Sequence, residues 1–275
     1  VILNILLDII FVMLFHWGIK GAAVATVVSQ FVSGTGILVY YYLYFPVLHV
    51  TRKHMHWDAG ILKEISKLSF LTCAQQSVMN FGILMVQGLV NSFGTVVMAA
   101  FAAAVKIDTI AYMPVQDFGN AFSTFVAQNY GAGKKERILK GIKSSVICVF
   151  IFCSIASLLV CIFAEPLMCI FINSSNIGVI REGVRYLRTE ASFYFGIGLL
   201  FMFYGYYRAA GRPGISVVLT ICSLGTRVVL AYILSAIPSV GVSGIWAAIP
   251  AGWVLADITG IVYFLRLNKK VLVNR

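Results

Sequence analysis

The chain is a succession of long apolar stretches separated by short polar segments, and this pattern restricts its fold more than any other feature. A membrane-spanning helix needs about 20 apolar residues, because the hydrocarbon core is about 30 Å thick and a helix rises about 1.5 Å per residue. Eight stretches reach or approach this length: 1–15, 21–45, 66–91, 94–128, 141–172, 186–210, 214–236 and 242–266. The sequence therefore predicts an all-α polytopic membrane protein with eight transmembrane helices.

The composition narrows the class of function. Of the 275 residues, 60% are hydrophobic and 11% are charged, whereas about a quarter are charged in soluble domains. The net charge of +11 lies in short segments, so there is no polar domain that could bind nucleic acid. The cysteines lack metal-ligand spacing, and the sequence has no Ser-His-Asp set or phosphate-binding loop. We therefore expect neither an enzyme nor a metal site, and no cofactor.

Basic residues orient the predicted helices. Four alternate connections, 46–67, 131–143, 208–212 and the tail from 266, contain 15 of the 21 lysines and arginines. Because basic connections remain in the cytoplasm, these segments and the C-terminus are predicted to be cytoplasmic. The connection 173–188 is an exception, since it carries arginines on the predicted outer side.

The two ends of the chain resemble each other. Residues 18–43 match residues 241–266 at a constant offset of 223, and both copies open with a G-x-x-G turn. An offset of this length corresponds to about six helices, which predicts a twelve-helix protein of two six-helix lobes. The first stretch is too short for a span and has no capping residues, so we expect the chain to be part of a longer protein.

These observations predict four regions. They are the last two helices of the N-terminal lobe (1–45), a cytoplasmic linker (46–65), a complete C-terminal lobe (66–266) and a cytoplasmic tail (267–275).

Polar side chains inside the predicted spans are candidates for a substrate or ion cavity, because a charge at mid-membrane costs about 3 kcal/mol. Gln76 and Asn80 share one helix face. Lys106 and Asp108 are two residues apart and point in different directions, so each needs a partner on another helix or a cavity. Asp117 lies further along the same span. Each of these five residues has a purely structural alternative as an interhelical contact or a cap.

Other residues in the spans are expected to have structural roles. Glu190 lies near the start of the predicted helix 186–210, which favours an interfacial position, and Asp257 is expected to join helices. The residues assigned to structural motifs are Asp8, Gly18, Gly21, Gln128, Asn129, Gly131, Gly133, Arg227 and Gly244.

Taken together, these motifs resemble multidrug and toxic compound extrusion (MATE) transporters. The segment 113–134 contains QNYGAG, which is similar to the Q-N-x-G-A-G signature that closes the second helix of a bundle in that family. Asn4 and Asp8 with the segment 18–26 resemble helices five and six, and 208–213 with 227–246 resemble the loop after helix ten and helices eleven and twelve. The branch looks like the bacterial DNA-damage-inducible-F-like group.

The resemblance implies a multi-pass antiporter of the bacterial inner membrane that exports cationic or amphipathic drugs and toxic compounds by alternating access. H+ or Na+ would drive it, and its partners would be those substrates, membrane lipid and the N-terminal lobe of the same protein. Some members use acidic residues in helices seven and ten, where this chain has Gln76, Asn80 and Glu190, which puts coupling of that kind in doubt. A lipid-linked precursor flippase of the same superfamily and a non-transporting scaffold are the alternatives.

Overall fold

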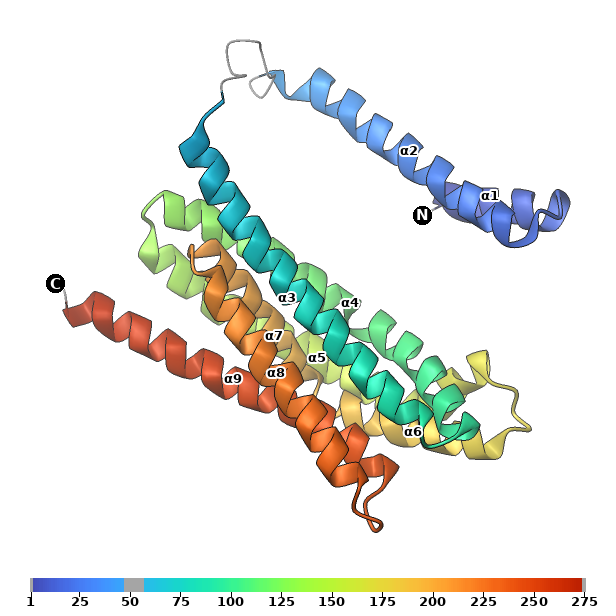
Figure 1. Ribbon diagram of the computed structural model, residues 1–275. Coiled ribbons are helices and arrows are strands. Elements are labelled where there is room, and N and C mark those ends of the chain that lie inside the picture. The colour runs from blue at the N-terminus through green and yellow to red at the C-terminus, as the bar shows by residue number, and fades with distance from the viewer. Residues whose placement is uncertain (1, 47–56, 274–275) are drawn as a thin grey trace. The chain divides into compact units, whose positions relative to one another are not determined.

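The computed structural model describes residues 2–46 and 57–273, and within these ranges the regular elements are helices (Figure 1). The chain forms two compact units, residues 1–61 and residues 62–275. The division falls inside the predicted linker 46–65, of which 47–56 lie outside the described residues. Each unit is treated separately below.

The first unit is a helical hairpin. Helix α1 (Ile2–Asp8) continues into a π-helical turn, η1 (Ile9–Leu14), and both pack against α2 (Gly18–Tyr44). Asp8, which was predicted to anchor this packing, is half-buried, and its Oδ1 has no hydrogen-bond partner among the described residues.

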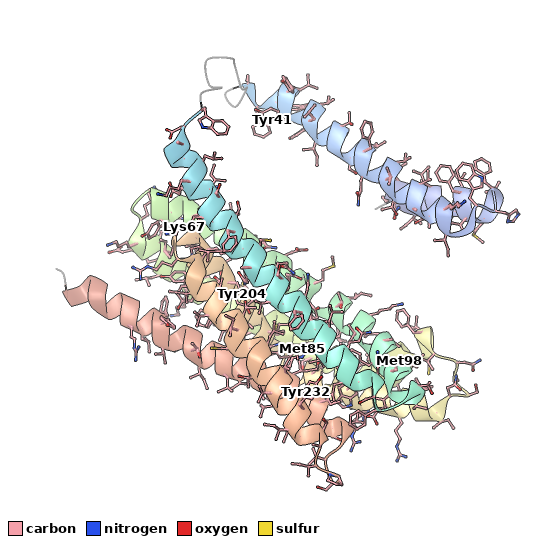
Figure 2. All side chains as sticks on the ribbon, in the orientation of Figure 1. Tyr41, Lys67, Met85, Met98, Tyr204 and Tyr232 are labelled. Atoms are coloured by element: carbon pink, nitrogen blue, oxygen red, sulfur yellow. The ribbon has the colours of Figure 1, made fainter. Side chains whose placement is uncertain are left out.

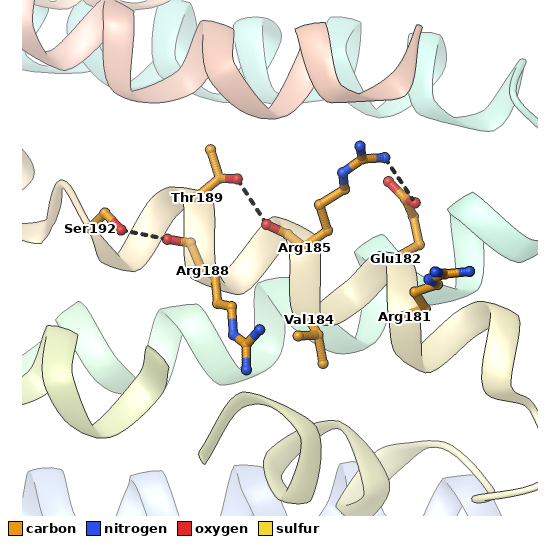
Figure 3. A pocket seen from close by; sticks show the side chains of 7 residues that line it. All are labelled: Arg181, Glu182, Val184, Arg185, Arg188, Thr189 and Ser192. Carbon is orange, nitrogen blue, oxygen red and sulfur yellow. Dashed lines mark hydrogen bonds and ion pairs between the residues drawn. The ribbon is translucent and has the colours of Figure 1, made fainter. Parts of the chain in front are cut away.

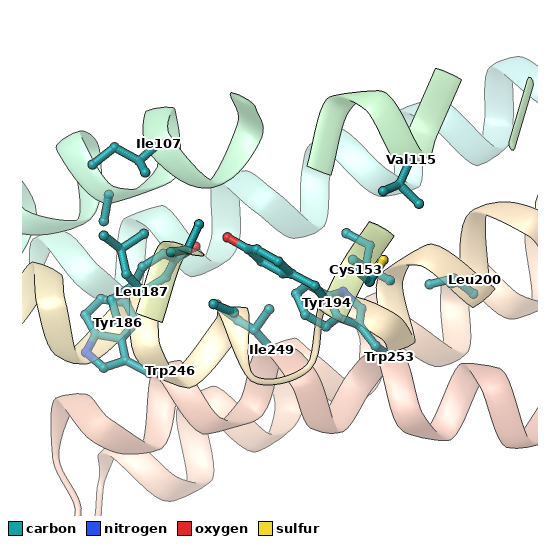
Figure 4. Close-up of a cluster of buried hydrophobic side chains, with 14 of the residues drawn as sticks. Ile107, Val115, Cys153, Tyr186, Leu187, Tyr194, Leu200, Trp246, Ile249 and Trp253 are labelled. Carbon is teal, nitrogen blue, oxygen red and sulfur yellow. The ribbon is translucent and has the colours of Figure 1, made fainter. Parts of the chain in front are cut away.

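The second unit is a bundle in which α4 lies at the centre, against α5, α6 and α7, while α8 packs along α9. The helices of this unit are α3 (Ala59–Asn91), α4 (Thr95–Gly131), α5 (Lys135–Phe171), α6 (Ile177–Ala191), α7 (Tyr194–Ala209), α8 (Pro213–Ser235) and α9 (Val242–Val273). Their shared core includes Ile107 and Val115 of α4 and Leu187 of α6 (Figure 4).

Five helices in the described part of the chain are long and apolar enough to cross a membrane, namely α2, α4, α5, α8 and α9. Large apolar side chains also stand outward from the second unit (Figure 2), among them Tyr232, which is 47% exposed. Ile155, Leu158 and Ile162 form a similar exposed surface on α5. Such surfaces are unfavourable in water and favourable in lipid. The total of eight membrane spans remains a prediction.

The single helix predicted over 186–210 is two helices, α6 and α7, which meet at Ser192 and Phe193. The Ser192 hydroxyl donates to the carbonyl of Arg188 at 2.7 Å, and the Phe193 N–H donates to the carbonyl of Glu190 at 2.9 Å. These short-range bonds replace the regular helical pattern with a turn. No glycine or proline marks the break, which explains why the sequence pattern missed it.

The repeat predicted at an offset of 223 is visible in the backbone. Gly18 is the first residue of α2 and Gly241 directly precedes α9, and both are left-handed, with φ of +54° and +51°. Glycine is the residue that adopts this conformation without steric cost. The two G-x-x-G turns are therefore alike in conformation as well as in sequence.

The second glycine of each turn makes matching contacts. A Cβ added to Gly21 would lie 2.9 Å from the carbonyl oxygen of Phe11, and one added to Gly244 would lie 2.9 Å from the carbonyl carbon of Leu234. Leu234 follows Phe11 by the same offset of 223. Each turn thus brings its helix against the preceding one at equivalent positions, which confirms the local repeat and leaves the six-plus-six layout a prediction.

The QNYGAG segment forms a helix C-cap. Gly133 is left-handed, with φ of +69°, and the Lys134 N–H donates to the carbonyl of Asn129 at 2.9 Å. The Gly133 N–H donates to the carbonyl of Tyr130 at 3.1 Å, which completes a Schellman motif. The Asn129 side chain is buried and donates to the carbonyl of Phe125 at 2.7 Å. The motif therefore ends α4 and turns the chain into α5.

Helices α4 and α7 approach closely at two glycines, which yields a stability test. A Cβ added to Gly205 would lie 2.5 Å from the backbone oxygen of Gly119, which cannot move aside as a side chain could. We expect Gly205→Ala to destabilise the full-length protein by about 1–3 kcal/mol, measured by thermal unfolding in detergent. Gly225→Ala is the control, because a Cβ there meets open space. Equal melting temperatures for both variants would contradict this packing.

Candidate functional site

A cavity of about 180 Å³ lies inside the second unit, between α3, α4 and the helices α6 to α9. Larger hollows occur along α6 and beside Lys134, but they are lined by residues of one short segment each. The internal cavity differs because it joins six helices and contains charged side chains from three of them, Asp108, Glu190 and Arg227. These features make it the candidate substrate or ion site.

Asp108 comes from the centre of α4 and is only 3% exposed. The phenol of Tyr194 donates to its Oδ1 at 2.5 Å. Tyr194 is the first residue of α7, so this hydrogen bond ties the carboxyl of α4 to the end of the broken helix. A short hydrogen bond to a carboxylate is among the stronger polar contacts in proteins.

Glu190 comes from the last turn of α6 and is 1% exposed. Its carboxyl lines the same cavity as that of Asp108 and interacts with it electrostatically, and its Oε1 has no hydrogen-bond partner among the described residues. Arg227 of α8 lines the same cavity and acts electrostatically on both carboxyls. Its Nε is likewise buried and unpaired within the described ranges.

Aromatic rings of α4 and α6 line the cavity beside the two carboxyls, and Tyr186 of this group is drawn with Trp246 of α9 in Figure 4. Tyr186 meets Phe101 and Trp246 edge-on, with ring centroids 5.5 and 4.9 Å away, and Phe101 stacks on Trp246 at 5.5 Å. Tyr186 and Trp246 are almost completely buried. The pair therefore lies in an apolar environment, where electrostatic interactions are stronger than in water.

Two adjacent carboxyls in such an environment repel each other when both are ionised. A proton held between them, or a cation bound to them, removes that repulsion, and Arg227 offsets part of the remaining charge. The site can therefore exchange a proton or a small cation as its surroundings change. Because Asp108 bonds α7 through Tyr194 while Glu190 belongs to α6, such an exchange acts on both halves of the broken helix.

Of the five residues that the sequence suggested for a cavity, the structure places one in the cavity lining. Asp108 lines the cavity, whereas the other four have exposed side chains and are not part of its lining: Gln76, Asn80, Lys106 and Asp117. Gln76 donates to Asn80 at 3.5 Å, and the Lys106 ammonium lies 6.0 Å from the ring centroid of Phe171. Cavity roles for these four remain predictions.

Sequence reasoning missed Glu190 and underestimated Arg227. Glu190 was expected at the membrane interface, because the predicted helix began at 186, but α6 begins at Ile177 and carries Glu190 to its inner end. Arg227 was expected to anchor the repeat rather than to contact substrate, and it lines the cavity. Gln87 of α3 also lies there. The cost of a charge within an apolar stretch was the available signal for both charged residues.

Within residues 2–46 and 57–273, no group of three or more His, Cys, Asp or Glu side chains could hold a metal ion.

Comparison with known families settles the class of protein. The MatE family model matches residues 69–233, which covers more than half of the chain. The chain belongs to the MatE family. A probable multidrug resistance protein of Bacillus subtilis, YpnP, is 29% identical over 271 residues, covering 96% of this chain and 58% of the relative. The probable multidrug resistance protein NorM of Thermotoga maritima is 26% identical over 282 residues, covering 99% and 60%.

Other MatE relatives and solved structures agree in fold. The FAD transporter of Shewanella oneidensis is 25% identical over 241 residues, covering 84% of this chain and 51% of the relative. A crystal structure of MATE in complex with MaL6 superposes with a TM-score of 0.89 at 23% identity, covering 99% of this chain and 61% of that one. The structure of a MOP superfamily transporter from Pyrococcus furiosus superposes with a TM-score of 0.88 at 23% identity, covering 97% of this chain and 60% of that one.

The MatE chain thus spans about 60% of the length of the curated relatives it matches. Family membership, together with the five apolar helices of the described residues, makes it a multi-pass membrane protein. The predicted resemblance to MATE transporters is confirmed. The DNA-damage-inducible-F-like branch remains a prediction.

The hydrogen bond between Tyr194 and Asp108 can be measured by a double-mutant cycle in the full-length protein. We expect Tyr194→Phe and Asp108→Ala to show a coupling of about 1–3 kcal/mol in thermal or denaturant unfolding, because each leaves the other without its partner.

Tyr207→Phe is the matched control, since its phenol donates to the carbonyl of Gly260 and it lies about 20 Å further along α7. The effects of Tyr207→Phe and Asp108→Ala on the free energy of unfolding should be additive. Additivity for Tyr194→Phe as well would show that the bond contributes nothing specific.

Proposed function

We propose that this chain belongs to an exporter that moves cationic or amphipathic drugs and toxic compounds out of the cell by alternating access, in exchange for inward H+ or Na+. The main observation behind this proposal is that Asp108 and Glu190 are both buried beside the broken helix of a MatE-family bundle. The partners would be small cationic or amphipathic substrates, membrane lipid and an N-terminal lobe of the same protein.

The named relatives support efflux. Three are named probable multidrug resistance proteins, and the MepA proteins of several staphylococci are named multidrug export proteins, with 21–23% identity to this chain. One relative is named an FAD transporter, so substrates differ within the group. Export of drugs by this protein follows from these names only as a proposal.

The carboxyl pair supports coupling to a cation. A proton or sodium ion bound between Asp108 and Glu190 would neutralise one negative charge inside the bundle, and its release would restore the repulsion. Tyr194 links this change to α7 and Glu190 links it to α6. The relative populations of two arrangements of α6 and α7 would therefore depend on occupancy, which is what a coupled transporter needs.

The alternative of a lipid-linked precursor flippase is less well supported. Such a protein is expected to have several cationic groups in its cavity, because its substrate carries phosphates. The cavity in the described part of the chain is lined by a single arginine, Arg227, against two carboxyls. The proposed location is the bacterial inner membrane, with the C-terminus in the cytoplasm, as the distribution of basic residues predicts.

Transport in vesicles tests the proposal. Full-length protein carrying Asp108→Asn or Glu190→Gln should lose at least about tenfold in the rate of gradient-driven export of a fluorescent cation, because each change removes one member of the carboxyl pair. Imposed pH and sodium gradients, applied separately, identify the coupling ion.

Glu165→Gln is the matched control, since Glu165 is an exposed carboxylate on α5 and does not line the cavity. It should transport like the wild type. Undiminished export by both cavity variants under either gradient would remove the pair from the coupling mechanism.

A further inference from the structure

One face of α6 carries three exposed arginines, Arg181, Arg185 and Arg188 (Figure 3). Their spacing of four and three residues places their Cα atoms on the same side of the helix, and the side chains of Arg185 and Arg188 extend from it in opposite directions (Figure 3). They line a surface groove of about 830 Å³ together with Glu182, Val184, Thr189 and Ser192. This groove is separate from the internal cavity, whose lining includes none of the three arginines.

The arginines of this α6 groove have few partners in the described parts of the chain. Arg185 Nη1 lies 3.9 Å from Glu182 Oε2, and Trp246 Nε1 donates to the other oxygen of Glu182 at 2.8 Å. Arg188 Nε donates to the carbonyl of Cys161 at 3.3 Å, and Arg181 has no polar partner within those ranges. Each guanidinium offers five N–H donors, so most donors in the groove are free to bind an anion.

The position of the α6 groove identifies the kind of anion. Arginines are rare within membrane helices because burying one in lipid costs about 3 kcal/mol, and long side chains reduce this cost by extending toward the headgroups. Helical side chains lean toward the N-terminus, and the N-terminus of α6, Ile177, follows the polar connection at Asn173. The arginines therefore extend toward the membrane surface, where lipid phosphates lie.

The neighbouring helix supplies an apolar surface. Helix α5 packs against α6 and exposes Leu158 and Ile162, three residues before and one residue after Cys161, whose carbonyl Arg188 contacts. A phospholipid whose phosphate lies in the groove would place its acyl chains against such a surface. The groove carries three positive charges against one negative charge, which complements an anionic headgroup and not a zwitterionic one.

We propose that the α6 groove binds an anionic phospholipid, with its phosphate held by Arg181 and Arg185 and its acyl chains along α5. This site is independent of the proposed transport reaction, and it accounts for the basic residues in 173–188 that depart from the distribution elsewhere in the chain.

Photo-crosslinking in nanodiscs tests the site on the full-length protein. Phosphatidylglycerol with a photoreactive group on an acyl chain should label peptides of α5 and α6, and phosphatidylcholine with the same group should label them at least about fivefold less. Arg181→Gln should reduce the phosphatidylglycerol labelling about fivefold, because one arginine near an anionic lipid contributes that factor in binding. Since Arg181 has no polar partner in the described chain, its replacement leaves the fold intact.

Lys63→Gln is the control, because it removes one exposed charge from a different basic segment, 46–67, on α3. It should leave labelling of α5 and α6 unchanged. Equal labelling by the two lipids, or the same loss in both variants, would overturn the proposal. Displacement of the lipid by free inorganic phosphate would overturn the assignment to a phospholipid.

Discussion

The second unit is organised around two carboxyls held side by side in an apolar bundle. Asp108 and Glu190 are both almost fully buried, and they come from helices that are far apart in sequence. In lipid such groups are tolerated only with partners, so Tyr194, Arg227 and the surrounding rings have to be positioned precisely enough to compensate for the lost hydration. The close packing of α4 against α6 and α7 provides this positioning.

The break between α6 and α7 follows from the same requirement. Inside a membrane, the backbone N–H and C=O groups of a continuous helix are hydrogen-bonded within the helix. A broken helix leaves some of these groups unpaired, and it is stable only where protein or a water-filled cavity provides hydrogen-bond partners for them. The break at Ser192 and Phe193 lies directly beside Glu190, and the next helix begins with the tyrosine that binds Asp108. The irregular backbone and the buried acids therefore lie together at one place in the bundle.

Local sequence patterns accounted for much of the architecture. The lengths of the apolar stretches located the helices within a few residues for most of the chain, and the G-x-x-G turns at Gly18 and Gly241 proved alike in conformation. The QNYGAG segment forms a cap because Gly133 adopts a left-handed conformation, a property that can be read from a glycine after a helix. The pattern failed at α6, whose arginines resemble a polar connection although they lie on a helix.

What the sequence by itself determined is the class of molecule, a helical membrane protein resembling MATE transporters, together with one residue of the site, Asp108. These depend on hydrophobicity and local backbone preference, which act over neighbouring residues. Only the tertiary structure decided that Glu190 and Arg227 join Asp108, and that Lys106 and Asp117 lie outside the cavity lining. The direction in which a polar side chain faces depends on how helices distant in sequence pack against each other, and a single chain's pattern does not contain that information.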